Sequence, residues 1–187
     1  MYKAIVIGAS AGGMHTLKLL LSGLESDFNM PILIVQHISP SSDNYMVEFL
    51  NKNTKLTVKE ADEKESLKNG IVYLSPPNYH MLVEEDFTIS LSAEQKVNYS
   101  RPSIDVLFMS ASDAFKKHLI GIILTGANDD GARGLLEIKR NKGLTIVQDP
   151  NEAETAAMPE AAIKCTNPHH ILGVEEISKL ISSFGDK

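Results

Sequence analysis

Continuous apolar runs recur along the chain, each bounded by glycine, proline or polar residues. Four of these runs are rich in Ile, Val and Leu, and they cover residues 4–7, 32–35, 119–124 and 144–147. An apolar run without polar alternation is typical of a strand that is buried on both faces, as in a parallel sheet. The pattern therefore predicts four central strands.

The segments between these runs carry apolar residues at intervals of three and four, the spacing of an amphipathic helix. This spacing is found in residues 14–21, 46–50, 104–115 and 135–139. Because strands and helices alternate, we predict an α/β fold with a doubly wound, mainly parallel sheet and helices on both of its faces. The length of 187 residues and the hydrophobic content of 43% favour a single domain over residues 1–187.

The middle of the chain departs from this alternation. Three short strand-like runs follow one another there with only short turns between them: residues 71–75, 80–83 and 87–91. This arrangement predicts an antiparallel hairpin excursion. Towards the end, Pro159 indicates a helix start, and residues 170–172 and 175–181 are expected to form a short strand and a last amphipathic helix.

The composition limits the kinds of partner and cofactor that we expect. The net charge is -6, and Lys and Arg do not cluster with aromatic residues, so nucleic acid is not expected as a partner. Cys165 is the single cysteine, which excludes an internal disulfide and a cysteine-rich zinc site. The six histidines are scattered without the spacing of metal ligands. We therefore expect neither a metal nor another cofactor.

The apolar runs are also too short for export or membrane insertion. The run at residues 4–7 is shorter than the roughly 7–15 apolar residues of a signal peptide. No run approaches the roughly 18 residues of a membrane span. These lengths, together with the single cysteine, predict a cytoplasmic protein.

Candidate catalytic side chains follow three of the predicted strands. Residues 8–12 spell G-x-S-x-G, a pattern that presents Ser10 on a sharp turn beside a helix N-terminus. His37 follows the second run, and Asp129 and Asp130 follow the run at residues 119–124. The carboxyl ends of neighbouring strands meet at one crevice in a doubly wound sheet. A hydroxyl, an imidazole and a carboxylate there would form the inventory of a serine esterase or amidase.

Several alternatives stay open at this point. Spacing does not choose between Asp129, Asp130 and Asp149 as the carboxylate, and each could instead cap a helix or turn. An α/β-hydrolase order with His170 as the base is a rival, although the His-Gly-Gly-Gly segment of that fold is absent. The turn at residues 8–13 could hold an anion, but it matches neither common phosphate-binding fingerprint.

Arg101 is a further candidate for substrate binding. It lies in the segment Ser100-Arg101-Pro102-Ser103, directly before a predicted helix whose expected N-cap is Ser103. A guanidinium there could orient an acidic or carbonyl substrate. The alternative is an ordinary ion pair on the surface.

Together these motifs resemble the catalytic domain of the CheB chemotaxis methylesterases, which remove methyl groups from glutamyl esters on bacterial chemoreceptors. The resemblance spans nearly the whole chain, and its motifs are residues 8–13, 36–37, 100–105, 124–126, 130–132, 148–149 and 158–162. It implies Ser10 as the nucleophile, His37 as the general base and Asp130 as the orienting acid. It also favours Asp130 over Asp129. The residues expected to hold the oxyanion or the substrate are Ala11, Gly12, Ala127 and Arg101.

The chain departs from the family pattern in three places. Ala11 stands where many relatives have threonine, and Ala127-Asn128 replaces the usual Met-Gly. A backbone N–H of Ala127 would still serve an oxyanion, since that donor does not depend on the side chain. The segment resembles the catalytic domain without the family's usual receiver domain, so we expect control, if any, from a separate response-regulator or signalling domain.

The resemblance also implies the partner. The expected substrate is a methylated helix of a chemoreceptor cytoplasmic region, with deamidation of glutamine as a second reaction on the same path. The competing hypothesis is a catalytically weak or inactive module of the same fold that only binds receptors.

Overall fold

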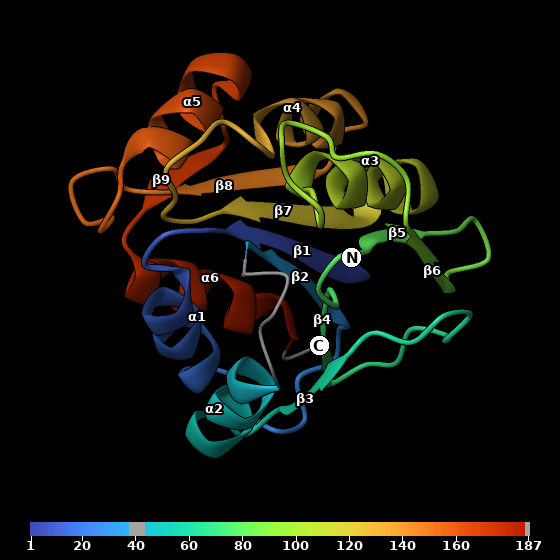
Figure 1. Cartoon of the computed structure of the whole chain (residues 1–187). Helices are drawn as coiled ribbons and strands as arrows, with labels where there is room; N and C mark the ends of the chain where they lie inside the picture. The colour runs from blue at the N-terminus through green and yellow to red at the C-terminus, as the bar shows by residue number, and fades with distance from the viewer. Residues whose placement is uncertain (38–43, 186–187) are drawn as a thin grey trace.

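The computed structural model describes residues 1–37 and 44–185 of the chain. Its main sheet has seven strands in the order β3-β4-β2-β1-β7-β8-β9, and every neighbouring pair is parallel (Figure 1). The strands are β1 (Ala4–Ala9), β2 (Ile32–Gln36), β3 (Thr57–Glu60), β4 (Ile71–Leu74), β7 (Leu119–Ile123), β8 (Leu144–Gln148) and β9 (His170–Leu172). A separate antiparallel pair consists of β5 (His80–Val83) and β6 (Ile89–Ser92).

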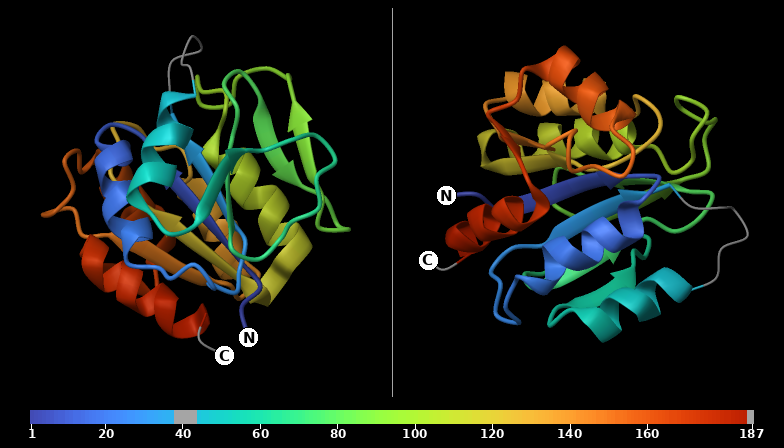
Figure 2. Two further views of the ribbon diagram at one scale, coloured as in Figure 1. Left: turned by 90° about the horizontal axis from the view of Figure 1, so that it is seen from below. Right: turned by 90° about the vertical axis from the view of Figure 1, so that its left-hand side faces the viewer.

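Helices cover both faces of the sheet, which confirms the predicted doubly wound architecture (Figures 1 and 2). One face carries α1 (Gly13–Ser22), α2 (Tyr45–Asn53) and α6 (Val174–Gly185). The other face carries α3 (Ile104–Phe115), α4 (Ala132–Arg140) and α5 (Ala157–Thr166), with the short 3-10 helix η1 (Lys116–His118) after α3. No helix of the described segments is long and apolar enough to cross a membrane.

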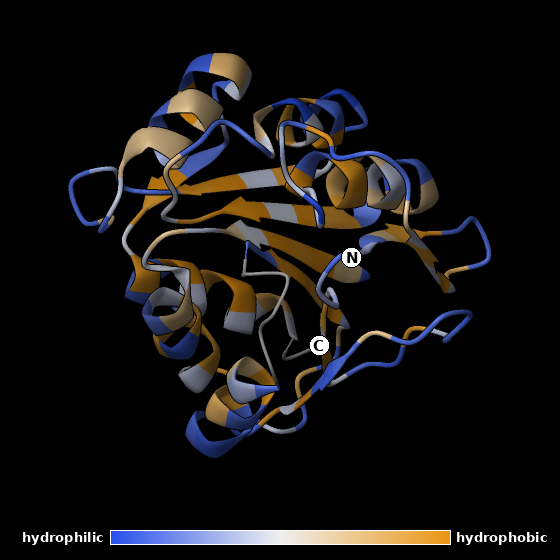
Figure 3. Cartoon of the chain, in the orientation of Figure 1, coloured by the Kyte–Doolittle hydropathy of each residue, from blue (hydrophilic) through white to orange (hydrophobic). Residues whose placement is uncertain are grey.

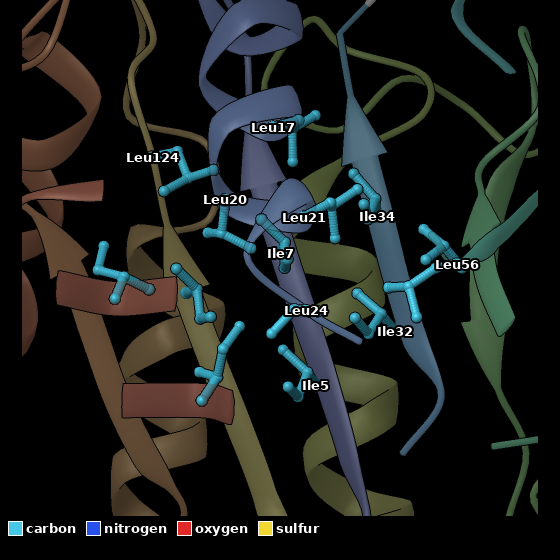
Figure 4. Packing of buried hydrophobic residues seen from close by; sticks show 14 of the residues in the cluster. Ile5, Ile7, Leu17, Leu20, Leu21, Leu24, Ile32, Ile34, Leu56 and Leu124 are labelled. Carbon is cyan, nitrogen blue, oxygen red and sulfur yellow. The ribbon is translucent and has the colours of Figure 1, made fainter. Parts of the chain in front are cut away.

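Each face of the sheet has its own hydrophobic core. Along β1, Ile5 and Ile7 point into the core under α1 and α6, while Ala4 and Val6 point into the core under α3. Figure 4 shows the first of these cores, where leucines of α1 at helical spacing lie over the isoleucines of β1 and β2. Burying one such side chain stabilises the fold by about 1.5–3 kcal/mol. The central strands are accordingly mainly apolar, and polar residues lie on the outer helix surfaces (Figure 3).

The predicted three-run excursion is wrong in its first run. β4 belongs to the main sheet, where it pairs in parallel with β2 and β3, and only β5 and β6 form an antiparallel hairpin. The reason lies in the side chains: Val72 and Leu74 enter one core and Tyr73 enters the other. A strand buried on both faces is continuously apolar, so the run at residues 71–75 is typical of a central strand rather than of a hairpin.

The edge strand β3 was not predicted. It has the sequence Thr57-Val58-Lys59-Glu60, and only Val58 in it is buried. An edge strand exposes one side to water and therefore lacks the apolar run that marks the central strands. The predicted end of the chain is confirmed, with Pro159 in the first turn of α5, followed by β9 and by an α6 longer than expected.

The order of the strands creates one crevice at the carboxyl edge of the sheet. The chain runs from β1 to β2 on one side of β1 and later places β7 on its other side. At such a switch point the helices that follow neighbouring strands go to opposite faces of the sheet, and ligands bind between the loops at the carboxyl ends of those strands. The turn after β1 and the loops after β2 and β7 carry the three candidate catalytic residues.

Candidate active site

Backbone hydrogen bonds tie together the three loops that carry the candidate residues. The Ser10 N–H donates to the Thr125 carbonyl at 2.9 Å, which joins the ends of β1 and β7. The His37 N–H donates to the Ala9 carbonyl at 3.1 Å, which joins the ends of β1 and β2. Both contacts continue the parallel pairing beyond the last register pairs of the strands, which are Ala9 with Gln36 and Gly8 with Ile123. The predicted convergence of these loops is thus a consequence of parallel pairing.

The turn that presents Ser10 is held from several sides. Gly12 adopts a φ of 78°, which a residue with a side chain rarely adopts, and α1 begins immediately after it. The Gln36 amide Nε2 donates to the Ser10 carbonyl at 2.8 Å, and the Thr125 hydroxyl donates to the Ala11 carbonyl at 2.8 Å. These bonds fix the backbone of the turn. The Ser10 hydroxyl itself has no hydrogen bond within residues 1–37 and 44–185.

His37 is paired with Asp130. Its Nε2 atom lies 2.9 Å from Oδ2 of Asp130, and the side chains are 14% and 0% exposed. An ionised carboxylate only accepts hydrogen bonds, so Nε2 carries the proton and Nδ1 keeps its lone pair. On the Nδ1 side, the Asn128 amide Nδ2 lies 3.4 Å away. The imidazole is therefore held in the tautomer that can accept a proton at Nδ1.

Asp130 is buried at the N-terminus of α3. Besides His37, its carboxylate accepts hydrogen bonds from the Ile104 N–H (2.7 Å), the Ser103 hydroxyl (2.9 Å), the Asp105 N–H (3.1 Å) and the Asn98 amide (3.2 Å). Burial by itself raises the pKa of this carboxyl. The hydrogen bonds from His37 and from the two backbone amides outweigh that effect, so the pKa lies below its ordinary value. Asp130 is thus an anion that can orient and stabilise an imidazolium.

The other two aspartates make no contact with His37. Asp129 is exposed, and its carboxylate has no hydrogen bond in the described part of the chain. The carboxylate of Asp149 accepts hydrogen bonds from the Asn151 backbone N–H and side-chain amide at 2.9 and 3.0 Å, so it stabilises its own turn. Of the aspartates that spacing left open, Asp130 is the one that contacts the imidazole.

The rival arrangement with His170 as the base is excluded by the strand order. His170 lies on β9 at the edge of the sheet, and β7 and β8 separate β9 from β1. Three strand spacings place it roughly 14 Å from the strand that leads to Ser10. An imidazole at that distance cannot take a proton from the Ser10 hydroxyl directly.

The backbone amides that could hold an oxyanion are free. Ala11, Gly12 and Ala127 lie on the turns after β1 and β7, and their N–H groups have no acceptor within the described residues. Gly12 directly precedes α1, so partial positive charge of the helix terminus is added to these donors. A carbonyl oxygen that gains negative charge next to Ser10 would be stabilised by such donors.

Among the described residues, Arg101 has no partner for the surface ion pair that was one alternative from the sequence. Its Nη1 atom donates to the carbonyls of Ala93 and Glu94 at 2.6 and 2.8 Å, which anchors the loop before α3. The same side chain lines a cavity of about 180 Å³ beside His37, together with Asn78, Lys96, Tyr99, Ser100 and Pro102. Its role in substrate binding stays a prediction.

Two residues of the site were missed from the sequence. Asn98 donates through Nδ2 to both Asp105 (2.9 Å) and Asp130 (3.2 Å), and so bridges two buried carboxylates. Ser103 was predicted as an N-cap, which the structure confirms, but its hydroxyl also donates to Asp130. For Asn98 the sequence contains no usable signal, since an Asn in a polar loop usually caps a turn.

Asp105 and Asp130 are two buried carboxyl groups bridged by Asn98, and the pKa of Asp105 can be tested by its effect on stability. Burial, followed by the nearby charge of Asp130, raises its pKa above the ordinary value, although the Gly134 N–H donates to it at 2.7 Å. A raised native pKa gives stability that is complete below the unfolded value of about 3.9 and is lost as the pH rises through the native value. We therefore compare the unfolding free energy of the wild type with that of Asp105→Asn. The wild-type value minus the Asp105→Asn value should become smaller as the pH rises.

Urea unfolding of both proteins between pH 4 and pH 7 would measure this difference. The lowered pKa of Asp130 makes a contribution of opposite sign, which is lost as the pH falls, so it does not produce a loss of stability as the pH rises. A difference that stays constant over the whole range would contradict the raised pKa of Asp105.

Comparison with known proteins connects this geometry to one family. A family model described as CheB methylesterase matches residues 5–181. A Leptospira interrogans protein, provisionally named protein-glutamate methylesterase/protein-glutamine glutaminase, is 52% identical over 179 residues and matches 96% of this chain and 93% of its own. A Clostridium acetobutylicum protein with the same activities in its name is 35% identical over 94% of this chain but only 51% of its own length.

A solved structure has the same fold. The crystal structure of the Thermotoga maritima CheB methylesterase catalytic domain superposes with a TM-score of 0.94 and 29% sequence identity. The match covers 98% of this chain and 99% of that chain. The seven-stranded sheet and the antiparallel pair therefore form a catalytic-domain fold that is already known.

Proposed function

This chain belongs to the CheB methylesterase family, and on that premise we propose that it hydrolyses glutamyl methyl esters on proteins, and deamidates glutamine, through Ser10, His37 and Asp130. The observation that carries the proposal is the 2.9 Å contact between His37 Nε2 and a buried, ionised Asp130, beside the turn that presents Ser10. This contact leaves Nδ1 of the imidazole as the proton acceptor.

The first half of the reaction transfers the acyl group to the enzyme. His37 Nδ1 takes the proton of the Ser10 hydroxyl while the oxygen attacks the ester carbonyl. The resulting oxyanion accepts hydrogen bonds from the backbone amides of Ala11, Gly12 and Ala127. As the intermediate collapses, the C–O bond to the methoxy group breaks, and methanol leaves with the proton that His37 held. Asp130 stabilises the transient imidazolium.

The second half regenerates the enzyme. A water molecule loses a proton to His37 Nδ1 and attacks the acyl carbon, and the Ser10 oxygen leaves with that proton. The products are a glutamate side chain and free Ser10. Glutamine follows the corresponding path: its amide carbonyl forms a tetrahedral intermediate that carries NH₂ in place of the methoxy group, and ammonia leaves with the proton that His37 held.

The proposed substrate is a helix of a chemoreceptor cytoplasmic region that carries methylated glutamates. The cavity beside His37 has a volume of about 180 Å³, which fits one short side chain rather than a large ligand. A helix can present one such side chain to the cavity, because its side chains project outward from a convex surface. The reaction is placed in the cytoplasm. We assign its control to a response-regulator or signalling domain.

Methanol release from a methylated chemoreceptor fragment tests this function. We expect the wild-type chain to release methanol with single-site saturation kinetics, and to release ammonia from a matching fragment with glutamine at the same positions. Absence of both products, with binding of the fragment retained, would favour the competing hypothesis of a receptor-binding module.

A further inference from the structure

A fully exposed aromatic ring stands beside the proposed active site. Tyr99 is 97% exposed, more than any other large apolar residue in the described part of the chain. Tyrosine buries a large apolar area when it is covered, and such rings are enriched where proteins bind other proteins. Tyr99 lines the same cavity as His37, so whatever covers its ring lies next to the reacting group.

The turn that carries Tyr99 is held in one conformation. In residues 97–100, which we call the Tyr99 turn, Val97 and Ser100 exchange backbone hydrogen bonds of 3.1 and 2.8 Å. Asn98 and Tyr99 have φ values of 49° and 61°, so two residues with side chains lie consecutively in the left-handed region. This conformation is unfavourable for residues other than glycine, and it persists where the surroundings stabilise it.

The stabilising contacts come from the catalytic acid itself. Between Val97 and Tyr99, the Asn98 side chain turns inward and donates to Asp105 and Asp130 at 2.9 and 3.2 Å. Arg101 holds the other end of the loop through the carbonyls of Ala93 and Glu94. The ring of Tyr99 is therefore presented to solvent from a rigid base anchored on Asp130.

The charged side chains that line the cavity together with Tyr99 are positive. Lys96 and Arg101 line the same cavity, and neither is in an ion pair within residues 1–37 and 44–185. The chain as a whole carries a net charge of -6, so these two cations form a local exception. Two cations that pair with no carboxylate lie beside an exposed ring. This combination is complementary to a binding partner that carries acidic residues next to an apolar stripe.

We propose that Tyr99 and Lys96 recognise the helix that carries the substrate side chain. This inference rests on the proposed function, in which the substrate is a glutamate-rich helix and each turnover adds a carboxylate to it. The Tyr99 ring packs on the apolar stripe of that helix, and Lys96 pairs with a glutamate one turn from the reacting residue. Specificity for helical protein over small esters then comes from the Tyr99 turn.

Comparing two substrates separates recognition from chemistry. The probes are a methylated chemoreceptor cytoplasmic fragment and p-nitrophenyl acetate, which has no helix to bind. For Tyr99→Ala, we expect the ratio of kcat/KM for the fragment to kcat/KM for the small ester to fall about tenfold or more, mainly through the KM for the fragment. Tyr99→Phe keeps the ring and should retain most of the ratio.

Two further variants sharpen the test. Lys96→Gln should lower the same ratio at low salt and lose its effect at high salt, because the charge it removes is exposed. Phe87→Ala is the control, since Phe87 is a partly exposed aromatic residue that stacks on Phe115 at 4.8 Å and does not line the His37 cavity. It should leave the ratio unchanged.

The outcomes distinguish the two proposals. An unchanged ratio in Tyr99→Ala, or an equal loss with both substrates, would overturn the recognition role. If the wild type hydrolyses the small ester but releases no methanol, the proposed function fails, and fragment affinity becomes the readout. A dissociation constant about tenfold higher for Tyr99→Ala than for the wild type would then still support recognition, and equal or absent binding would refute it.

Discussion

Replacing Ser10 with alanine is expected to lower methanol release from a methylated chemoreceptor fragment about 10⁴-fold or more. The hydroxyl oxygen forms the covalent bond in the proposed mechanism, and within the described residues no other group on the turns after β1, β2 and β7 is placed to replace it. The variant can still bind the substrate and stabilise an oxyanion. These two effects account for only a small part of the rate enhancement of a serine hydrolase. The same variant should also lose hydrolysis of p-nitrophenyl acetate.

The fold should tolerate this change. The Ser10 hydroxyl makes no hydrogen bond within the described residues, while the backbone of the turn keeps its bonds to Thr125 and Gln36. We therefore expect the unfolding free energy of Ser10→Ala to stay within about 1 kcal/mol of the wild-type value. Ser22→Ala, on the exposed face of α1, is the matched control and should leave turnover unchanged.

Activity of Ser10→Ala within tenfold of the wild type would refute Ser10 as the nucleophile. A large loss in both Ser10→Ala and Ser22→Ala would instead indicate damage to α1. Mass spectrometry of the wild type with a fluorophosphonate probe gives an independent measurement, since the adduct should lie on the peptide that contains Ser10.

The central strands were predictable because burial on both faces makes a strand continuously apolar. The runs at residues 4–7 and 32–35 correspond to β1 and β2 within two residues at either end. The same rule applied to β4, whose interpretation as part of a hairpin came from its position before two hairpin strands rather than from its composition. β3 could not be found in this way, because an edge strand with one buried residue resembles a loop.

The sequence could predict which candidate residues lie close together where their proximity follows from the order of the strands. Ser10, His37 and Asp130 follow strands that are neighbours in the sheet, so alternation of strands and helices was enough to bring their loops together. Asn98 could not be found, because its contacts depend on a turn with two left-handed residues, and hydrophobic periodicity carries no information about such a turn. The exposure of Tyr99 has the same origin.

Spacing left Asp129 and Asp130 open, the family resemblance favoured Asp130, and the contact with His37 agrees with that choice. This choice leads to the second large effect. Asp130→Asn is expected to lower turnover about 10⁴-fold, whereas Asp129→Asn should change it less than about twofold. In Asp130→Asn, a neutral amide replaces the carboxylate, so the negative charge that stabilises the imidazolium is lost. His37 is also no longer held in the tautomer with a free Nδ1 lone pair. Asp129 is exposed and makes no contact with the imidazole.

Stability should separate the same two variants. The Asp130 carboxylate accepts five hydrogen bonds in a buried position, among them the backbone N–H groups of Ile104 and Asp105 at the start of α3. In asparagine one oxygen becomes an NH₂ group that faces donors, which leaves buried N–H groups unpaired at about 1–3 kcal/mol each. Urea unfolding should show a loss of that size for Asp130→Asn, and a change within about 0.5 kcal/mol for Asp129→Asn.

A third variant distinguishes the catalytic effect of Asp130 from its structural effect. Ser103→Ala removes one hydrogen bond to Asp130 and the N-cap of α3, but it leaves the carboxylate and its contact with His37 in place. It should lower stability by about 1 kcal/mol and turnover only slightly. If Ser103→Ala lowered turnover as much as Asp130→Asn, the loss in both would reflect disorder of α3. If Asp129→Asn were the more damaging of the two aspartate variants, Asp129 would be the orienting acid.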